Sequence, residues 1–320
     1  ELYGLSIAIY RRLVAQEGRS ELAGDMAKAL LNKANLLFQT GVMLDALEQY
    51  GLAVDTMRRL VEQEGRSELA NDLALALMGN ANTLHSMGKQ ADAVKMYDES
   101  IIIYRRLVEG EARRGLAYEL AMALMNKCNA LGSTGDYPGA IKSIDESIAL
   151  YVQMVEKEGR REVAKDLANA VMNKANILVN MCKWQNAIKL YDICIAMFQQ
   201  VIAHEGRGEL AGEIAKALMN KAIALEEMGD LHGALKQYDS CILIRQRLVT
   251  QNGRQDLLGD LCWVQLLRAA VMKDVGAVSE DALLQAREAY HALAIEAQRT
   301  GRVELMGAME RAHEVLGDIL

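Results

Sequence analysis

A nine-residue segment recurs along the chain at intervals of 47 residues. Each copy begins with alanine and ends with asparagine, and the four copies are Ala27–Asn35, Ala74–Asn82, Ala121–Asn129 and Ala168–Asn176. A fifth, partial copy is Asn220-Lys221-Ala222. A period held without slippage across most of a chain indicates a repeat array, in which each unit packs mainly on its neighbours.

Glycines mark the ends of two predicted helices in each unit. A Gly-Arg pair closes most units, and a second glycine, or Cys182 in one copy, lies about half-way between. Apolar residues recur at every fourth position between these points, which is helical spacing and not strand alternation. Glycine just past a helix accepts the left-handed backbone conformation without a Cβ penalty. Each unit therefore predicts a first helix A, a short turn and a second helix B.

This pattern predicts the domain organisation. Residues 1–17 form a partial N-terminal repeat that contains helix B only. Residues 18–302 form six A–B pairs, of which the sixth diverges from the pattern, and residues 303–320 form a C-terminal capping helix. The total is about 14 helices. Because the chain opens at Glu1, without Met and inside a repeat, we expect it to be a fragment of a longer protein.

Composition favours an all-α chain and excludes several classes of protein. The chain has one proline and 5% aromatic residues, so few helix breakers interrupt it. The net charge of −7 argues against nucleic-acid binding, which needs a basic surface. No apolar run is long enough for a membrane span, and the N-terminal residues show no signal-peptide pattern. The five cysteines lack metal-ligand spacing and are expected to be small buried residues in a reducing, cytoplasmic compartment.

The repeat columns resemble the tetratricopeptide repeat. The small residue in helix A, the glycine at the turn and the small and aromatic residues of helix B fall, in the second copy, on Ala81, Gly88, Ala93, Tyr97 and Ser100. The resemblance implies an all-α, right-handed α-solenoid of antiparallel helix pairs. Each unit exceeds the usual repeat by 13 residues, and the long form looks most like repeat arrays in large bacterial proteins.

The resemblance also implies a binding site, because tetratricopeptide arrays bind ligands mainly on the concave wall of the A helices. Transferred column by column, the wall holds asparagines, methionines and a histidine. The predicted peptide-binding residues are Asn35, Asn82, Asn129, Asn176, Asn169, Asn180, Met78, Met122, Met125, Met172 and His85.

Two interpretations of these columns stay open. An asparagine amide offers two donors and an acceptor, which suits it to hold the backbone of an extended peptide. The alternative is that the asparagines satisfy hydrogen bonds within or between helices. The methionines suit an adaptable apolar surface, although a methionine stripe at helical spacing is more often core.

A lysine column occupies the place where the family has a buried leucine. These lysines could attract acidic groups of a peptide, or they could pair with an aspartate column on the B helices and keep the repeats in register. The lysines are Lys33, Lys127, Lys174 and Lys221, and the aspartates are Asp98, Asp145, Asp192 and Asp239.

No motif of an enzyme is present in the linear sequence. The histidines are scattered, and there is no phosphate-binding glycine loop and no Gly-x-Ser-x-Gly. The sequence therefore predicts a non-enzymatic interaction scaffold without a cofactor or metal, which binds a protein or peptide partner, neither nucleic acid nor membrane, and can self-associate through exposed repeat ends. The alternative is a regulatory or sensor region that controls a protease-like or nucleotide-switch module elsewhere in a longer chain.

Overall fold

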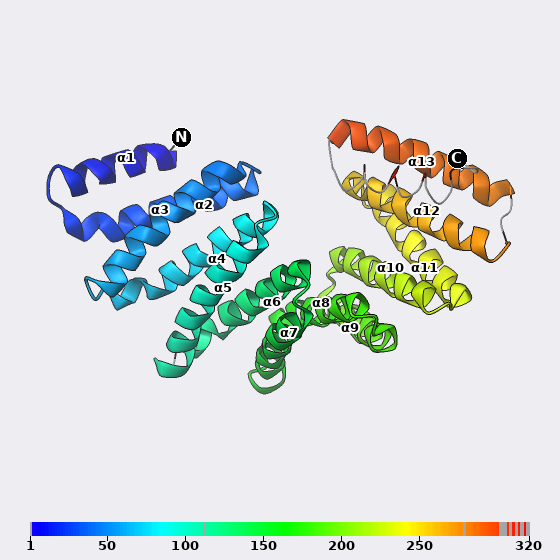
Figure 1. Ribbon diagram of the computed structural model, residues 1–320, viewed down its shortest axis with the longest axis horizontal. Coiled ribbons are helices and arrows are strands. Elements are labelled where there is room, and N and C mark those ends of the chain that lie inside the picture. The colour runs from blue at the N-terminus through cyan, green and yellow to red at the C-terminus, as the bar shows by residue number, and fades with distance from the viewer. Residues whose placement is uncertain are drawn as a thin grey trace. The chain divides into compact units, whose positions relative to one another are not determined.

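The computed structural model describes residues 2–111, 113–277 and 280–300, together with Met306, Met309, Glu310, His313 and Gly317. These residues contain 13 α-helices and no strand. The chain divides into two compact units, Glu1–Arg160 and Arg161–Leu320, and Figure 1 shows the helices of each.

The first unit holds seven of these helices. They are α1 (Leu2–Ala15), α2 (Ala23–Gln39), α3 (Met43–Glu62), α4 (Ala70–Ser86), α5 (Gln90–Arg105), α6 (Ala117–Thr134) and α7 (Tyr137–Val152). The second unit holds α8 (Ala164–Asn180), α9 (Trp184–Glu205), α10 (Ala211–Glu227), α11 (Leu231–Thr250), α12 (Leu258–Asp274) and α13 (Glu280–Thr300).

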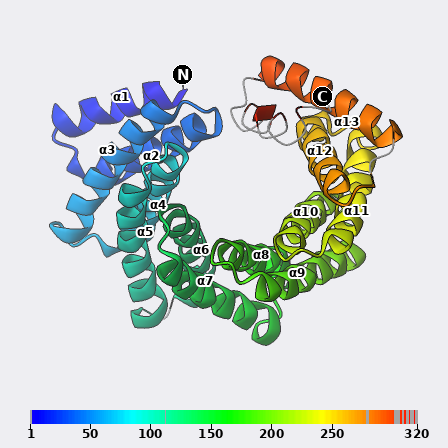
Figure 2. The ribbon, with the colours of Figure 1, turned by 45° about the vertical axis from the view of Figure 1, so that its right-hand side comes forward.

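Within each unit the helices alternate between two layers. The even-numbered helices are the predicted A helices, and they lie in one layer, where α4 contacts both α2 and α6, and α10 contacts α8. The odd-numbered helices are the predicted B helices, and α3, α5, α9 and α11 each pack against the A helices before and after them (Figure 2). The predicted fold class, an all-α solenoid of antiparallel helix pairs, is confirmed.

The A helices begin with a short turn of tighter winding, which the sequence pattern did not predict. The Gly-Arg pair is followed by a three-residue 3₁₀ turn, such as Ser67–Leu69, and only then by an α-helix of 17 or 18 residues. A 3₁₀ turn is a common way to tighten a helix end, where backbone N–H groups have no partner inside the helix.

The turn glycines adopt the left-handed conformation that the sequence predicts. Gly41, Gly88, Gly135 and Gly229, which follow A helices, have φ between 76° and 82°. Cys182 occupies the same place in the fourth copy and keeps the same backbone, with a φ of 57°. The array therefore imposes the turn geometry on a residue with a Cβ, at a cost in strain.

Two aspartates cap the N-termini of B helices. The Asp136 carboxylate accepts a hydrogen bond from the Gly139 N–H at 3.0 Å, and Asp230 accepts one from the Gly233 N–H at 2.9 Å. Pro138 lies in the first turn of α7. At that place a proline costs no hydrogen bond, since the N–H groups of a first turn have no partner in the helix.

The core consists of alanine, leucine and a few large side chains from the B helices. The buried tyrosines Tyr50, Tyr97, Tyr191 and Tyr238 share one column of the repeat and are at most 2% exposed. The predicted division into a leading B helix, six pairs and a capping helix stays a prediction, and the capping helix at 303–320 lies largely outside the described residues.

Candidate functional site

The predicted asparagine column is joined to the tyrosine column of the B helices. The hydroxyl of Tyr97, on α5, donates to Oδ1 of Asn82, on α4, at 2.6 Å. The same bond joins Tyr50 to Asn35 and Tyr191 to Asn176, each at 2.6 Å. Each tyrosine lies on a B helix and each asparagine on the A helix before it, so the bond links the two layers within one repeat. The tyrosine side chains are buried.

A second bond links successive A helices. Nδ2 of Asn126, on α6, donates to Oδ1 of Asn82 at 3.1 Å, and Nδ2 of Asn220, on α10, donates to Oδ1 of Asn176 at 3.0 Å. The oxygens of Asn82 and Asn176 thus accept two hydrogen bonds each. Both amides are held in one orientation, with the nitrogen directed away from the two donors.

Two copies depart from this arrangement. Asn129 has Ile144 at the tyrosine position, so no tyrosine holds its amide. In the fifth repeat Ile223 replaces the asparagine, and the Tyr238 hydroxyl instead donates to the Glu226 carboxylate at 3.0 Å. Burial, together with that hydrogen bond to a carboxylate, raises the pKa of Tyr238, and burial raises the pKa of Glu226.

Gly79 marks a further variation, because it replaces an asparagine of the column to which Asn126 and Asn220 belong. A Cβ at Gly79 would collide with the ring of Tyr50. Glycine therefore lets the tyrosine of the preceding repeat lie directly against α4, in place of a bond between two asparagines.

The predicted methionines fall into two groups. Met78 is 7% exposed and Met172 is 8% exposed, so their side chains belong to the packed interior. Met122 and Met125 are half-buried on α6, and Met122 packs against the core formed by α4, α5 and α6. Only the second group offers much surface to a ligand.

The remaining predicted residues lie on the A helices α4 and α8. Asn169 is half-buried and Asn180 is exposed at the end of α8. His85 is half-buried at the end of α4, where its Nδ1 contacts the side-chain oxygen of Gln90 on α5. Gln90 also donates to the backbone carbonyl of His85 at 3.3 Å. His85 is therefore part of the turn between the two helices.

Two lysines of the column, Lys127 and Lys221, pair with the aspartate column, as one of the two interpretations predicted, whereas Lys33 donates to the side-chain oxygen of Gln49 at 3.2 Å. Nζ of Lys127 lies 2.5 Å from Oδ1 of Asp98, and Nζ of Lys221 lies 2.6 Å from Oδ1 of Asp192. Each pair joins an A helix to the B helix of the preceding repeat. Since the aspartates are about half exposed, water weakens the attraction, and the pairs contribute more to register than to stability.

The cysteines do not all follow the prediction of buried small residues. Cys128, Cys194, Cys241 and Cys262 are buried, but Cys182 is exposed. Burial raises the pKa of Cys128 and Cys194 to about 12 and that of Cys241 and Cys262 to about 11.

In the described part of the chain, no three His, Cys, Asp or Glu side chains gather as metal ligands would. No helix there has both the length and the apolar character that a bilayer crossing requires.

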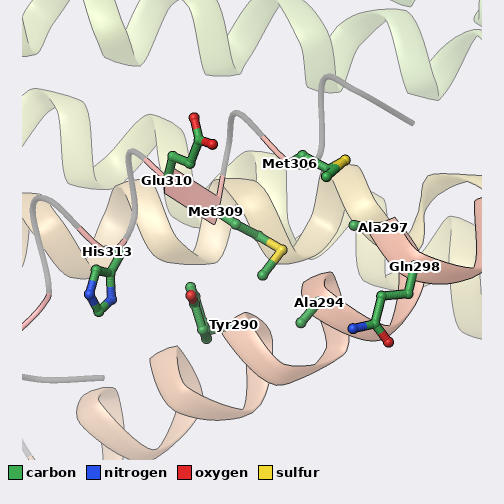
Figure 3. Close-up of a pocket in the computed structure, with 8 residues that line it drawn as sticks. All are labelled: Tyr290, Ala294, Ala297, Gln298, Met306, Met309, Glu310 and His313. Atoms are coloured by element: carbon green, nitrogen blue, oxygen red, sulfur yellow. The ribbon is translucent and has the colours of Figure 1, made fainter. Parts of the chain in front are cut away.

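Sequence reasoning missed a pocket of about 730 Å³ beside α13 (Figure 3). One wall is α13, and Met309 extends toward the space between Tyr290 and Ala294. Its lining residues are Tyr290, Ala294, Ala297, Gln298, Met306, Met309, Glu310 and His313. The pocket lies in and beyond the divergent sixth pair, where the repeat columns no longer guide prediction. The helical spacing of Met306, Met309 and His313 was the sequence pattern that could have indicated it.

The comparisons with known proteins agree with this architecture. A family model described as tetratricopeptide repeat matches residues 73–111 and 214–251, which span the α4–α5 and α10–α11 pairs. These two helix pairs match the tetratricopeptide repeat. The resemblance predicted from the columns is confirmed, and no curated protein sequence matches the chain.

Solved structures share the fold at low sequence identity. BtubC (BKLC) from P. vanneervenii has a TM-score of 0.60 and 19% identity over 80% of this chain and 91% of its own. The apo form of RapI has a TM-score of 0.61 and 13% identity, over 92% and 97%. A Rap protein complexed with Competence and Sporulation Factor has a TM-score of 0.56 and 13% identity, over 99% and 85%.

Proposed function

We propose that this chain is a non-enzymatic protein-interaction scaffold that binds an extended segment of a protein partner. The proposed binding surface is the A-helix face, which is the side of the A helices that carries Asn35, Asn82, Asn129 and Asn176. The observation that carries the proposal is the fixed orientation of the asparagine amides. Asn82 and Asn176 use their oxygens for Tyr97, Tyr191 and the asparagines of the next A helix.

The opposite end of each amide supplies the binding groups. An asparagine Nδ2 carries two N–H donors, and within the described residues no hydrogen bond uses those of Asn82 or Asn176. Both side chains are half-buried, so their donors lie at the boundary between core and solvent. Donors already held in place lose little conformational entropy when a carbonyl oxygen binds.

The surroundings suit a peptide backbone with apolar side chains. Leu75 on α4 and Met122 on α6 occupy the same repeat position and are half-buried. They lie seven residues before Asn82 and Asn129, respectively. Main-chain carbonyls of an extended segment would accept from the amides, while its side chains would contact the leucine and methionine. Met78 and Met172 would support this face from beneath.

The structural comparison adds a precedent at the level of the fold. A Rap protein with a similar architecture was crystallised in complex with Competence and Sporulation Factor, so a fold of this kind can hold a second molecule. The regulatory alternative requires a catalytic module, and no observation on the described residues favours it.

The test separates the binding role of the amides from their structural role. Peptides selected from a random displayed library for binding to the protein would be titrated against the wild type and against a variant with Asn82→Asp and Asn176→Asp. Aspartate keeps the oxygen that accepts from the tyrosine but removes the N–H donors. We expect affinity to fall about tenfold or more, since each lost hydrogen bond is worth about 1 kcal/mol and a carboxylate repels a carbonyl oxygen.

A matched control changes amides on the other layer. Gln199 and Gln200 are exposed on α9, and their replacement by Glu adds the same charge without touching the A-helix face. Unchanged affinity in the aspartate variant, or an equal loss in the glutamate control, would remove the A-helix face as the binding site.

A further inference from the structure

One recurring ion pair joins a basic residue on an A helix to an aspartate on the B helix before it. Nζ of Lys127 lies 2.5 Å from Oδ1 of Asp98, for example. One repeat earlier, Gly51 on α3 occupies the aspartate position and Asn80 on α4 occupies the lysine position. The acid and the base are therefore replaced together, which avoids a half-buried cation without a carboxylate.

A second recurring ion pair joins successive B helices. Nη2 of Arg105, on α5, lies 2.6 Å from each carboxylate oxygen of Glu146, on α7. One repeat later, the two equivalent positions hold Val152 and Ile193. Here too the sequence replaces the base and the acid together.

The first repeat keeps both bases and lacks both acids. Gly4 on α1 occupies the aspartate position that corresponds to Lys33 on α2. Leu52 on α3 occupies the glutamate position that corresponds to Arg11 on α1. Nζ of Lys33 donates to the side-chain oxygen of Gln49 at 3.2 Å, and no carboxylate of the described residues pairs with Lys33 or Arg11. Two positive charges thus lack the carboxylates that their equivalents have.

These two bases line one pocket of about 520 Å³ between α1, α2 and α3. Gln49, which accepts from Lys33, is 8% exposed, so the ammonium group is held from the interior side of the pocket. Gly4 lies on the α1 wall, and a Cβ added there would meet no atom within 4 Å. The pocket therefore has open space at the position where other repeats hold the aspartate side chain.

The charges around the pocket favour an anion. Lys33, Arg11 and Arg12 line it, and Arg12 lies 3.5 Å from the carboxylate of Glu17. Glu48 also lines the pocket, but it is exposed and forms no ion pair with these bases in the part of the chain that the structure describes. The bases therefore outnumber the carboxylates, and they attract a negatively charged ligand.

We propose that this pocket binds a small molecule that carries two carboxylate groups. One carboxylate takes the place of the missing aspartate and accepts from Nζ of Lys33. The other takes the place of the missing glutamate and accepts from the guanidinium of Arg11. The equivalent contacts in other repeats have lengths of 2.5 and 2.6 Å, and small-molecule sites commonly have volumes of about 300–1,000 Å³. None of the asparagines of the A-helix face lines the pocket, so the two sites are separate.

The first experiment titrates the intact protein with malonate, succinate, glutarate and adipate by calorimetry at low ionic strength, where charge pairs are least screened. We expect saturable binding of at least one diacid. Acetate at the same ionic strength should bind about tenfold more weakly or less tightly still, because it makes only one of the two charged contacts. Lys33→Met and Arg11→Met should each weaken diacid binding about tenfold or more for the same reason.

The second experiment supplies the missing acids from the chain itself. Gly4→Asp and Leu52→Glu should each weaken diacid binding about tenfold or more, because a built-in carboxylate competes at an effective concentration on the order of millimolar. Gly51→Asp is the matched control for the first variant, since it adds the same charge at the equivalent position of α3. Ile193→Glu is the control for the second, and both controls should leave the affinity unchanged. The unfolding temperature of each variant verifies that it is folded.

Four results would overturn the proposal. The first is the absence of saturable binding for all four diacids, and the second is diacid binding that both Lys33→Met and Arg11→Met leave unchanged. The third is an equal loss of affinity in Gly51→Asp and Gly4→Asp, which would make the effect one of overall charge. The fourth is tighter binding of inorganic phosphate than of every diacid, since the site would then recognise a different anion.

Discussion

The Tyr97 hydroxyl and the Asn82 side-chain oxygen lie 2.6 Å apart and join the two helices of one repeat. Tyr97 is buried, so without Asn82 its hydroxyl would lose a partner in a place that water does not reach. The bond recurs with the same separation of 15 residues in the first and fourth repeats. The asparagines therefore have a structural role, which the proposed binding role uses but does not replace.

The first prediction concerns the energy of this bond. We expect Asn82→Ala to lower the free energy of unfolding by about 1–3 kcal/mol, because it leaves the Tyr97 hydroxyl buried without an acceptor. Tyr97→Phe should cost about 1 kcal/mol, since it removes the hydroxyl itself. The double variant should be more stable than the sum of the two losses implies. Urea unfolding of the four proteins measures the coupling.

Tyr137→Phe is a suitable control, because Tyr137 lies half-buried at the start of α7 and no asparagine accepts from it. Its stability should match that of the wild type within about 0.5 kcal/mol. Additive losses for Asn82→Ala and Tyr97→Phe would mean that the bond has no energetic role.

Much of the fold could be predicted from the period alone. Spacing and glycine positions are local properties, so they located the helices and the turns. The sequence left two roles open for the asparagines and could not decide between them, because their partners come from other helices. Asn82 is bound by a tyrosine 15 residues later and by Asn126, 44 residues later. Such contacts depend on how helices pack, and Ile144 and Ile223 interrupt the pairing of tyrosine with asparagine along the sequence. Likewise, only packing shows that Met78 is interior and Met122 half-exposed.

A second prediction follows from the backbone of Cys182, which has a φ of 57° where the other repeats have glycine. Glycine adopts this conformation without the cost of roughly 1–2 kcal/mol that a Cβ brings, although it also makes the unfolded chain more flexible. We expect Cys182→Gly to raise the free energy of unfolding by about 0.5–1 kcal/mol. Gly135→Ala, at the same place in the third repeat, should lower it. Thermal and urea unfolding measure both changes, and a destabilised Cys182→Gly protein would contradict the strain argument.

The thiols provide a third prediction. Cys182 is exposed, whereas burial raises the pKa of Cys128 and Cys194 to about 12 and that of Cys241 and Cys262 to about 11. Because the thiolate is the reactive form, we expect one equivalent of a thiol reagent to react rapidly at pH 8 and the other four to react only on unfolding. Cys182→Ser should abolish the rapid phase. A rapid phase that persists in this variant would mean that a buried thiol becomes accessible in the native state.

The fourth prediction concerns pH and the carboxyl group of Glu226. Burial raises its pKa in the folded protein above the ordinary value. The folded state therefore binds this proton more tightly than the unfolded state, and the free energy of unfolding falls as pH rises from the ordinary glutamate pKa to the raised one.

Glu226→Gln keeps an oxygen that can accept from the Tyr238 hydroxyl, which lies 3.0 Å from the carboxylate in the wild type, but it carries no charge. We expect this variant to be more stable than the wild type above that pH window and to lose this part of the pH dependence. Glu227→Gln, at an exposed neighbour on the same helix end, should reduce this pH dependence only in part, because the Glu227 charge adds to the effect of burial on the pKa of Glu226. Urea unfolding between pH 4 and pH 8 measures the difference, and parallel profiles for wild type and Glu226→Gln would show that Glu226 does not titrate differently on folding.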